Sequence, residues 1–335
     1  MNEAASIGST HERARGCLAG LALGDAIGRP SEGMSAAQIQ DRWGLIAGFV
    51  EDEPAGSDDT EYALMTARTV LRCGAEATSD DFAETWYADA VSQAEGFRGG
   101  GFSEMAAIDN LRRGVHPPLS GQHVHGWSDG LAMRVAPLGI VAAGDPQLAR
   151  RLAEADGAVS HSGEGILAGV VVAVAVAVAM AGAPIDDVVD AAIAAIPTDS
   201  WTSRNLRLAR RLVASCSDSA DLARTLYERL AALDYYWADL GPEAVGLAFA
   251  ALIHGRGEFR ASTLFAVNLG RDSDTNAAIA GCVSGALSGI STFPPEWVSQ
   301  VRPVAGSCLR STAEMDPLEV AEKLADLVTQ RSVTA

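Results

Sequence analysis

Lysine is almost absent from this chain of 335 residues, which has a single one, Lys323, close to its C-terminal end. A Schiff-base lysine and the lysine of a phosphate-binding P-loop are therefore excluded from everything before that position. Positive charge is scarce in general, because 25 Lys and Arg residues oppose 43 Asp and Glu residues and the net charge is −18. Nucleic acids and anionic membranes bind clustered positive charge, so we expect neither as a partner.

Cysteine is also sparse, and its pattern limits the possible compartments. The five cysteines are widely spaced, odd in number and form no C-x-x-C pair. This pattern argues against a disulfide scaffold and against a zinc site. The N-terminal segment MNEAASIGSTHERARG contains no apolar core of a signal peptide. We therefore expect a cytoplasmic protein in a reducing environment.

One long uncharged segment occurs, from Gly165 to Ile185. Its 21 residues are long enough to span a bilayer. However, they are mostly Ala, Val and Gly, and the acidic residues at both ends come without the Lys, Arg or aromatic residues that anchor a membrane span. The segment is therefore predicted to be a helix buried on all sides in the core of a large globular protein.

Most of the chain shows apolar residues at helical spacing, without the period-two runs that indicate strands. The first helix is predicted to begin at the capping box Ser9-x-x-Glu12. No stretch rich in Pro, Gly or Ser separates domains, so we predict an all-α fold: a single compact multi-helix domain over residues 1–335, with its core at about 10–330. The aromatic cluster from Tyr235 to Trp237 is predicted to pack into this core rather than line a cleft.

Two clusters of carboxylates and hydroxyls, far apart in the sequence, are the most informative feature. The first is Gly56-Ser57-Asp58-Asp59-Thr60 and the second is Gly270-Arg271-Asp272-Ser273-Asp274-Thr275-Asn276. Each lies where a loop enters a predicted helix, so helix capping alone could explain the first. The second offers more oxygen ligands than a cap needs. It also precedes a helix of small apolar residues, near which uncompensated carboxylates would be costly.

A hard cation would remove this conflict between acidic loops and a buried helix. Mg²⁺ and Mn²⁺ bind carboxylate, hydroxyl and water oxygens. The lack of a His and Cys cluster argues against zinc, and the Gly and Glu that complete an EF-hand loop are missing after Asp272. The two clusters therefore predict a site for a divalent cation such as Mg²⁺ or Mn²⁺.

Five segments, taken in chain order, resemble the ADP-ribosylglycohydrolase family, the group that includes dinitrogenase reductase-activating glycohydrolase. They are GDAIGRPSE (24–32), SDDTEYAL (57–64), SDGLAMRVAPLG (128–139), SHSGEGILAG (160–169) and GRDSDTNAAIAGCVSGALSG (270–289). The resemblance implies an all-α fold with a binuclear metal cleft that holds two Mg²⁺ ions, or Mn²⁺. It also implies a glycosidase that hydrolyses an N- or O-glycosidic bond at C1″ of ADP-ribose.

The resemblance also implies roles for individual residues. The implied metal ligands are Ser57, Asp58, Asp59, Asp272, Asp274 and Thr275. Glu32 and Asp59 are the expected catalytic residues, because either could position the attacking water or assist the leaving group. The turn Ser128-Asp129-Gly130 matches the turn that holds the diphosphate and distal ribose, and His161 matches a histidine that contacts the substrate.

Three further features bear on the substrate. The family's turn commonly reads Gly-Asn-Gly, so Asp129 brings a negative charge toward a diphosphate. Arg271 replaces a residue that is often small, and it could face the substrate, pair with Asp129 or be an ordinary surface arginine. Gly100 belongs to the Gly-rich stretch 96–103, which could contact phosphate or adenine or be a plain loop. We count Gly100 and Arg271 among the expected substrate-binding residues.

Three functions stay open on the sequence alone. The first hypothesis is a Mg²⁺-dependent hydrolase that removes ADP-ribose from a protein side chain, above all arginine. The second is a hydrolase of a small ADP-ribosylated, NAD-derived or nucleoside metabolite. The third is a non-catalytic relative that binds ADP-ribose or has a structural role, which we disfavour because every implied ligand position keeps an oxygen side chain. We expect the protein to act as a monomer.

Overall fold

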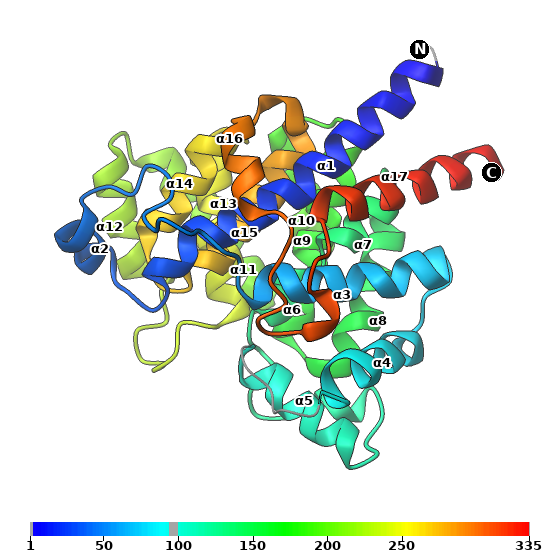
Figure 1. Cartoon of the computed structure of the whole chain (residues 1–335). Coiled ribbons are helices and arrows are strands. Elements are labelled where there is room, and N and C mark those ends of the chain that lie inside the picture. Colours follow the sequence, from blue (N-terminus) through cyan, green and yellow to red (C-terminus); the bar gives the residue numbers. More distant parts are fainter. Residues whose placement is uncertain (1–2, 94–99, 335) are drawn as a thin grey trace.

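Helical spacing of apolar residues predicts the fold correctly. Within residues 3–93 and 100–334, which the computed structural model describes, there are seventeen α-helices and no strand (Figure 1). The helices are α1 (Glu3–Gly28), α2 (Ala36–Trp43), α3 (Asp58–Cys73), α4 (Ser79–Trp86), α5 (Phe102–Arg112), α6 (Gly130–Arg134), α7 (Ala136–Val141), α8 (Pro146–Ser160), α9 (Glu164–Met180), α10 (Ile185–Ala194), α11 (Trp201–Ser215), α12 (Ser219–Leu230), α13 (Gly241–His254), α14 (Phe259–Leu269), α15 (Ser273–Ser288), α16 (Pro295–Val298) and α17 (Pro317–Thr334). The predicted all-α architecture in one compact body is confirmed.

Small residues bring α1 and α15 into direct backbone contact. Glycines repeat at every fourth position of α1, at 16, 20, 24 and 28, and such spacing places them on one face of a helix. A Cβ at Gly20 would lie only 2.1 Å from the carbonyl oxygen of Gly281, and one at Gly28 would lie 2.5 Å from Cα of Asp274. The two helices therefore run antiparallel, and the end of α1 meets the start of α15.

The uncharged segment forms α9 and lies at the centre of the bundle, as predicted. Val170 to Ala177 are all buried, and α9 packs against α7, α8 and α10. At the start of α9, Glu164 accepts hydrogen bonds from the backbone N–H groups of Trp201 and Thr202 at 2.7 and 2.9 Å, so it caps α11. Among the described residues, no helix has both the length and the hydropathy needed to cross a membrane.

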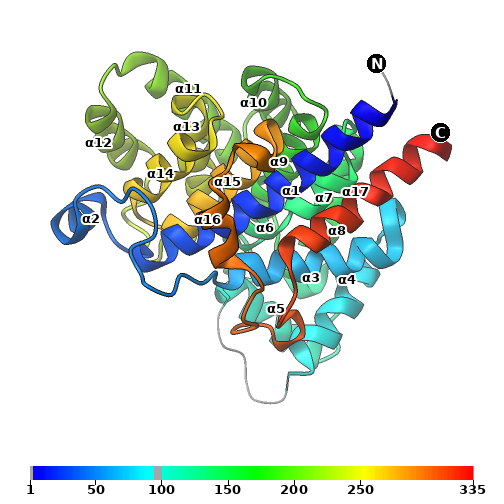
Figure 2. The ribbon, with the colours of Figure 1, turned by 45° about the horizontal axis from the view of Figure 1, so that its top comes forward.

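The first helix begins earlier than predicted. It is continuous from Glu3, so Ser9 lies inside α1 and is not its N-cap. A capping motif therefore does not mark the start of this helix, which packs against α17. Figures 1 and 2 show these two helices side by side, with both chain ends on the same side of the molecule.

Candidate active site

A buried carboxylate of α1 holds the loop that enters α3. The oxygens of Asp25 accept hydrogen bonds from the backbone N–H of Ser57, at 2.8 and 2.9 Å, and from that of Thr60, at 3.1 Å. Ser57 is the N-cap of α3, and its Oγ accepts from the N–H of Asp59 at 3.3 Å. The negative charge of Asp25 also favours the positive end of the helix dipole. These contacts fix the start of α3, which carries Asp58 and Asp59.

The loop that enters α15 is joined to the segment that carries Glu32. Two backbone hydrogen bonds, of 2.7 and 2.8 Å, link Arg271 to residues 33–34. The hydroxyls of Ser31 and Ser273 lie 3.0 Å apart and are buried. Glu32 is therefore held beside the second acidic loop, although about 240 residues separate them in sequence.

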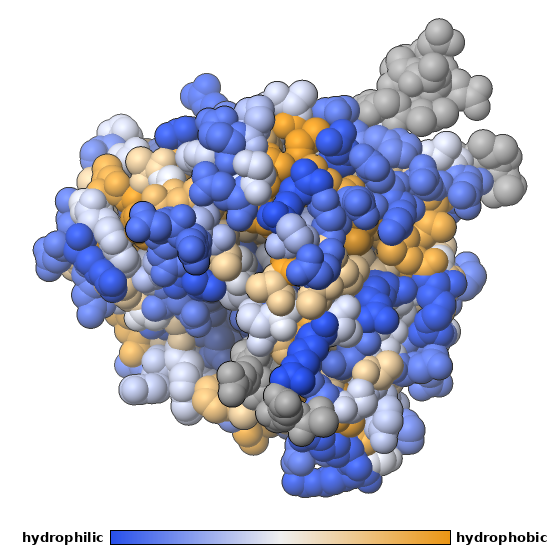
Figure 3. Space-filling view, viewed as in Figure 1, coloured by the Kyte–Doolittle hydropathy of each residue, from blue (hydrophilic) through white to orange (hydrophobic). Residues whose placement is uncertain are grey.

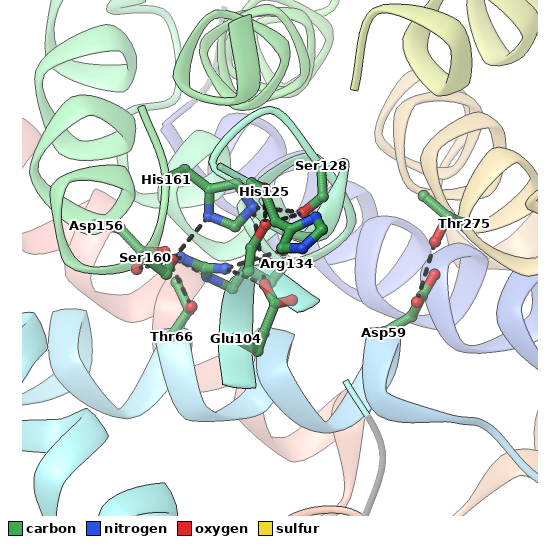
Figure 4. Close-up of polar contacts among 12 residues, drawn as sticks. Asp59, Thr66, Glu104, His125, Ser128, Arg134, Asp156, Ser160, His161 and Thr275 are labelled. Carbon is green, nitrogen blue, oxygen red and sulfur yellow. Dashed lines mark hydrogen bonds and ion pairs between the residues drawn. The ribbon is translucent and has the colours of Figure 1, made fainter. Parts of the chain in front are cut away.

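Carboxylates from both segments form a group that could hold a metal ion. One oxygen each of Glu32, Asp272 and Asp274 lies within 4.8 Å of the others. From the opposite side, Thr275 Oγ1 donates to Asp59 Oδ1 at 3.2 Å, which links the start of α15 to the start of α3 (Figure 4). Asp59 Oδ2 and Asp274 Oδ1 are buried and have no hydrogen-bond partner in the part of the chain that the structure describes.

This concentration of buried negative charge needs a counter-charge. Burial raises the pKa of Asp59, Asp272 and Asp274 well above the usual value of an aspartate, and neighbouring carboxylates raise it further. A hard divalent cation would supply the missing positive charge and would accept carboxylate and hydroxyl oxygens as ligands. The unpartnered oxygens and the all-oxygen donor set therefore fit Mg²⁺ or Mn²⁺ and do not fit zinc.

Both acidic loops face one cleft of about 710 Å³. Its lining comes from residues 32–33, 58–59, 100–105, 128–133, 236–239 and 271–275. All the predicted site residues line this cleft except Ser57 and His161. The fold thus gathers segments from six parts of the chain. Of the Gly-rich stretch, Gly100 lines the cleft, whereas Gly96 to Gly99 lie outside the described residues.

His161 lies behind the cleft wall. Its side chain is fully buried, with Nε2 3.0 Å from Ser128 Oγ and Nδ1 2.8 Å from Ser160 Oγ. Burial, assisted by the charge of Arg134, lowers the pKa of His161 well below its usual value, so the imidazole is neutral. A substrate contact by His161 stays a prediction, and in this geometry its hydrogen bond goes to Ser128, which lines the cleft.

A buried arginine, Arg134, forms hydrogen bonds with several polar side chains next to His161. Arg134 is fully buried and donates to both oxygens of Asp156 at 3.1 Å, to Glu104 Oε1 at 3.3 Å and to Ser160 Oγ at 2.8 Å (Figure 4). Burial raises the pKa of Glu104 to about 7, although the guanidinium of Arg134 opposes the rise. Glu104 Oε2 makes no hydrogen bond and belongs to a residue that lines the cleft.

The sequence did not single out two acidic residues of the cleft. They are Glu104, at the start of α5, and Asp239, in the loop before α13. The one available signal was position, because Glu104 follows the Gly-rich stretch and Asp239 follows the aromatic cluster. Asp129, which was expected in the site, lines the cleft with them, and its Oδ2 is buried without a partner.

Arg271 pairs with Glu243 rather than with Asp129, which was one of the three roles that the sequence left open. The guanidinium of Arg271 pairs with Glu243 of α13, with Nε 2.5 Å from Oε1 and Nη2 3.2 Å from Oε2. It also donates to the carbonyl oxygen of Trp237 at 3.3 Å. Glu243 is buried and is the nearer acid, so Arg271 joins the second acidic loop to α13 and to the loop before it.

The prediction that the aromatic cluster packs into the core is wrong. Tyr235 is only half-buried and lines another pocket. Tyr236 is 88% exposed and Trp237 is 39% exposed, and both line the cleft. The rings lie 5.4 Å apart, and Trp237 is 4.7 Å from the ring of Phe102 at the start of α5. They lie on the loop between α12 and α13.

A second cavity is larger than this cleft but contains none of the predicted site residues. It has a volume of about 1130 Å³, lies between α2, α12 and α14, and is lined by residues such as Leu45, Ala223, Leu264 and Phe265. Figure 3 shows hydrophobic side chains on this side of the molecule. None of the predicted site residues lines it, so the smaller, acidic cleft is the candidate active site.

The structure is an all-α bundle in which two acidic loops line one cleft, and comparison with known proteins names its family. The family model for ADP-ribosylglycohydrolase matches residues 7–333. An uncharacterized protein of Archaeoglobus fulgidus is 32% identical over 302 residues, which cover 87% of this chain and 92% of that protein. The ADP-ribosylarginine hydrolase Tri1 of Pseudomonas putida is 27% identical over 307 residues, 87% of this chain and 74% of its own.

A solved structure titled as an ADP-ribosylglycohydrolase-related protein complex has the same fold. It superposes with a TM-score of 0.65 at 23% identity and covers 96% of this chain and 99% of its own. The chain therefore belongs to the ADP-ribosylglycohydrolase family. It is an enzyme of the glycosidase type, which confirms the resemblance seen in the five sequence segments.

Proposed function

We propose that this chain is a metal-dependent hydrolase that cleaves the glycosidic bond at C1″ of ADP-ribose and releases ADP-ribose from a modified protein side chain such as arginine. The observation that carries the proposal is the meeting of two acidic loops in one cleft, where buried oxygens of Asp59 and Asp274 lack partners. Similarity to the ADP-ribosylarginine hydrolase of Pseudomonas putida supports arginine as the attachment site.

Seven oxygen-bearing residues around the two loops would hold two Mg²⁺ ions, or Mn²⁺. They are Glu32, Ser57, Asp58, Asp59, Asp272, Asp274 and Thr275. Such ions, when bound, orient sugar hydroxyls and lower the pKa of a bound water. Asp25 and the hydroxyl pair of Ser31 and Ser273 support these ligands from behind, since each is bonded to a ligand-bearing loop.

Glu32 and Asp59 are the proposed catalytic residues. In the net reaction the oxygen of water bonds to C1″, the bond from C1″ to the side-chain nitrogen breaks, and one proton of the water goes to that nitrogen. Burial, and then the charges of Asp58 and Asp25, raise the pKa of Glu32, which suits a carboxylate that takes a proton from the attacking water. Asp59 is held by Thr275 and orients that water.

The proposed substrate contacts come from the other walls of the cleft. Gly100 and the turn from Ser128 to Gly130 line it directly, and His161 acts through its hydrogen bond to Ser128. Arg271 lines the cleft with its guanidinium paired to Glu243, so its proposed contribution is to hold the loop in place. We further propose a monomeric, single-domain cytoplasmic enzyme, which the five unpaired cysteines support.

A turnover assay with Mg²⁺ or EDTA tests the proposal. The substrates are an ADP-ribosylarginine protein and a panel of free ADP-ribosyl metabolites that includes NAD. We expect Mg²⁺-dependent release of ADP-ribose from the protein, and loss of that release in Asp58→Asn. Release from a small molecule alone would show that the substrate is a metabolite and not a modified protein. Release that EDTA does not affect would contradict the metal assignment.

A further inference from the structure

A second group of carboxyls lines the cleft beside the metal-site loops. Glu104 Oε2, Asp129 Oδ2 and Asp239 Oδ1 are buried atoms, and none has a hydrogen-bond partner within residues 3–93 and 100–334. Glu104 is fully buried and Asp129 is only 4% exposed, yet both line the cleft. An orphaned buried carboxylate oxygen costs free energy, so three in one place indicate that a ligand supplies the missing donors.

Backbone contacts hold the three carboxyls together. The N–H of Asp129 donates to the carbonyl oxygen of Asp239 at 3.0 Å, which fixes the two loops side by side. A Cβ at Gly130 would lie 2.1 Å from Glu104 Oε1, so only glycine lets that carboxyl approach the turn. A Cβ at Gly101 would lie 3.1 Å from Glu104 Oε2 and 3.7 Å from Asp239 Oδ2. The absence of a side chain there keeps open a space within reach of two carboxyls.

We propose that Glu104, Asp129 and Asp239 form a subsite for a planar organic cation, the guanidinium group of the substrate's arginine. This inference rests on the proposed function, because it places the leaving group of that reaction. The group adjoins the metal-site loops: Asp59 is one of the charges that act on Asp129. A guanidinium attached to C1″ would therefore lie between the proposed metal ligands and these three carboxyls.

The spacing of the three carboxyls suits a broad cation better than a metal ion. Among the described residues, the carboxylates whose oxygens lie within 4.8 Å of one another are Glu32, Asp272 and Asp274, not this group. A guanidinium is flat, carries its charge over several atoms and presents five N–H donors in a fork. It can therefore satisfy carboxyls that approach from different directions and are too far apart to share one ion.

The aromatic rim of the cleft points to the same chemistry. Tyr236 and Trp237 line the cleft next to Asp239 and expose ring surface to it. Aromatic faces attract delocalised cations, and guanidinium groups stack on them readily. A pyridinium ring such as that of NAD would also stack, but its ring nitrogen has no N–H for the orphaned oxygens. A diphosphate at this wall would be repelled by Asp129 and its neighbours.

The test compares Asp129→Asn with the parent protein on three substrates that differ at C1″: free ADP-ribosylarginine, NAD and the neutral ester O-acetyl-ADP-ribose. The variant removes one charge and keeps the shape. We expect kcat/KM for ADP-ribosylarginine to fall about tenfold or more relative to any change in the value for the ester. Asp239→Asn should behave in the same way, and Asp234→Asn, on the exposed part of the same loop, should change neither substrate.

A binding measurement separates this inference from the proposed function. In EDTA, calorimetry gives the Kd of ADP-ribosylarginine and of ADP-ribose for each variant. We expect Asp129→Asn to weaken binding of the arginine conjugate by a larger factor than binding of ADP-ribose. Hydrolysis by the parent with equal losses on all substrates would overturn the subsite and leave the proposed function intact. A charge-dependent preference in binding, without any hydrolysis, would uphold the subsite and reject the hydrolase. A loss confined to NAD would overturn the guanidinium assignment.

Discussion

Two buried polar centres share helix α3, and they differ in how their charge is balanced. Toward its start, α3 carries Asp59, which faces Asp272 and Asp274 without any basic residue in the group. Further along the same helix, Thr66 Oγ1 donates to Asp156 at 3.2 Å, and Asp156 is paired with the buried Arg134 (Figure 4). The second centre carries its own cation, whereas the first must obtain one from solution.

This difference indicates that the second centre stabilises the fold and that the first is suited to bind a ligand. A buried ion pair whose oxygens are hydrogen-bonded tolerates burial, but removing one partner is strongly destabilising. Carboxylates without partners destabilise the fold until a ligand arrives, and such strain is typical of functional sites. Glu104 links the second centre to the proposed cation subsite, because Oε1 accepts from Arg134 and Oε2 has no partner among the described residues.

The largest expected effect follows from removing the charge of Arg134 in the second centre. Arg134→Met would leave Glu104 and Asp156 buried without a counter-charge, so the free energy of unfolding should fall by about 3–5 kcal/mol. Urea unfolding measures this change. The matched control is Arg210→Met, which breaks an exposed pair with Asp190 and should cost less than about 1 kcal/mol. Similar losses in the two variants would break the comparison.

The next effect is a pH dependence that comes from Glu104. Its pKa is raised from 4.5 to about 7 in the folded protein, so the native state binds a proton more tightly than the unfolded state does. The contribution to stability is complete below pH 4.5 and is lost as pH rises through about 7, on the order of 3 kcal/mol in all. Glu104→Gln should flatten this decline. The measurement is Tm against pH in EDTA, and parallel curves for the two proteins would contradict the prediction.

The first centre, around Asp59, Asp272 and Asp274, should make the stability of the protein depend on added metal. At a Mg²⁺ concentration 100 times Kd, the parent should gain about 2.7 kcal/mol of stability. Asp274→Asn should gain far less, and in EDTA it should be at least as stable as the parent because one uncompensated charge is gone. Urea unfolding with and without Mg²⁺ checks both statements. An equal gain in both proteins would remove Asp274 from the metal site.

The smallest expected effect concerns the carboxylate behind the first acidic loop. Asp25→Asn should cost about 1–2 kcal/mol, because the amide keeps one acceptor oxygen and brings a donor toward other donors. It should also weaken Mn²⁺ binding, since Asp25 fixes the backbone that presents Asp58 and Asp59. Calorimetric titration with Mn²⁺ gives the affinity. A loss of stability with unchanged Mn²⁺ affinity would show that Asp25 supports only the fold.

Much of the fold and of the first centre could be predicted from the sequence because the signals are local. Periodic apolar residues predicted the helices, and the long uncharged run predicted the buried helix α9. The acidic loops at 56–60 and 270–276 contain their ligand types side by side, so their chemistry could be inferred before their meeting in one cleft was seen. The early start of α1 was missed because a capping motif does not exclude a longer helix.

The second centre and the cation subsite could not be predicted in the same way. Glu104 and Asp239 are single acids in unremarkable surroundings, and their significance depends on which oxygens stay unpartnered after packing. The partner of Arg271 stayed open for the same reason, since Glu243 comes close only when α13 is in place. Tyr236 and Trp237 were assigned to the core because aromatic residues usually pack there, whereas both are exposed on the loop between α12 and α13.

The sequence by itself determined an acidic, all-α chain with two carboxylate loops suited to a hard cation, and its ordered segments were sufficient to place it in its family. These properties follow from residue types and spacings within a few turns of chain. Only the tertiary structure decided which charges are paired and which are not. Balance of charge in a buried site depends on contacts between distant helices, such as the glycine contact of α1 with α15 that brings Glu32 to Asp274.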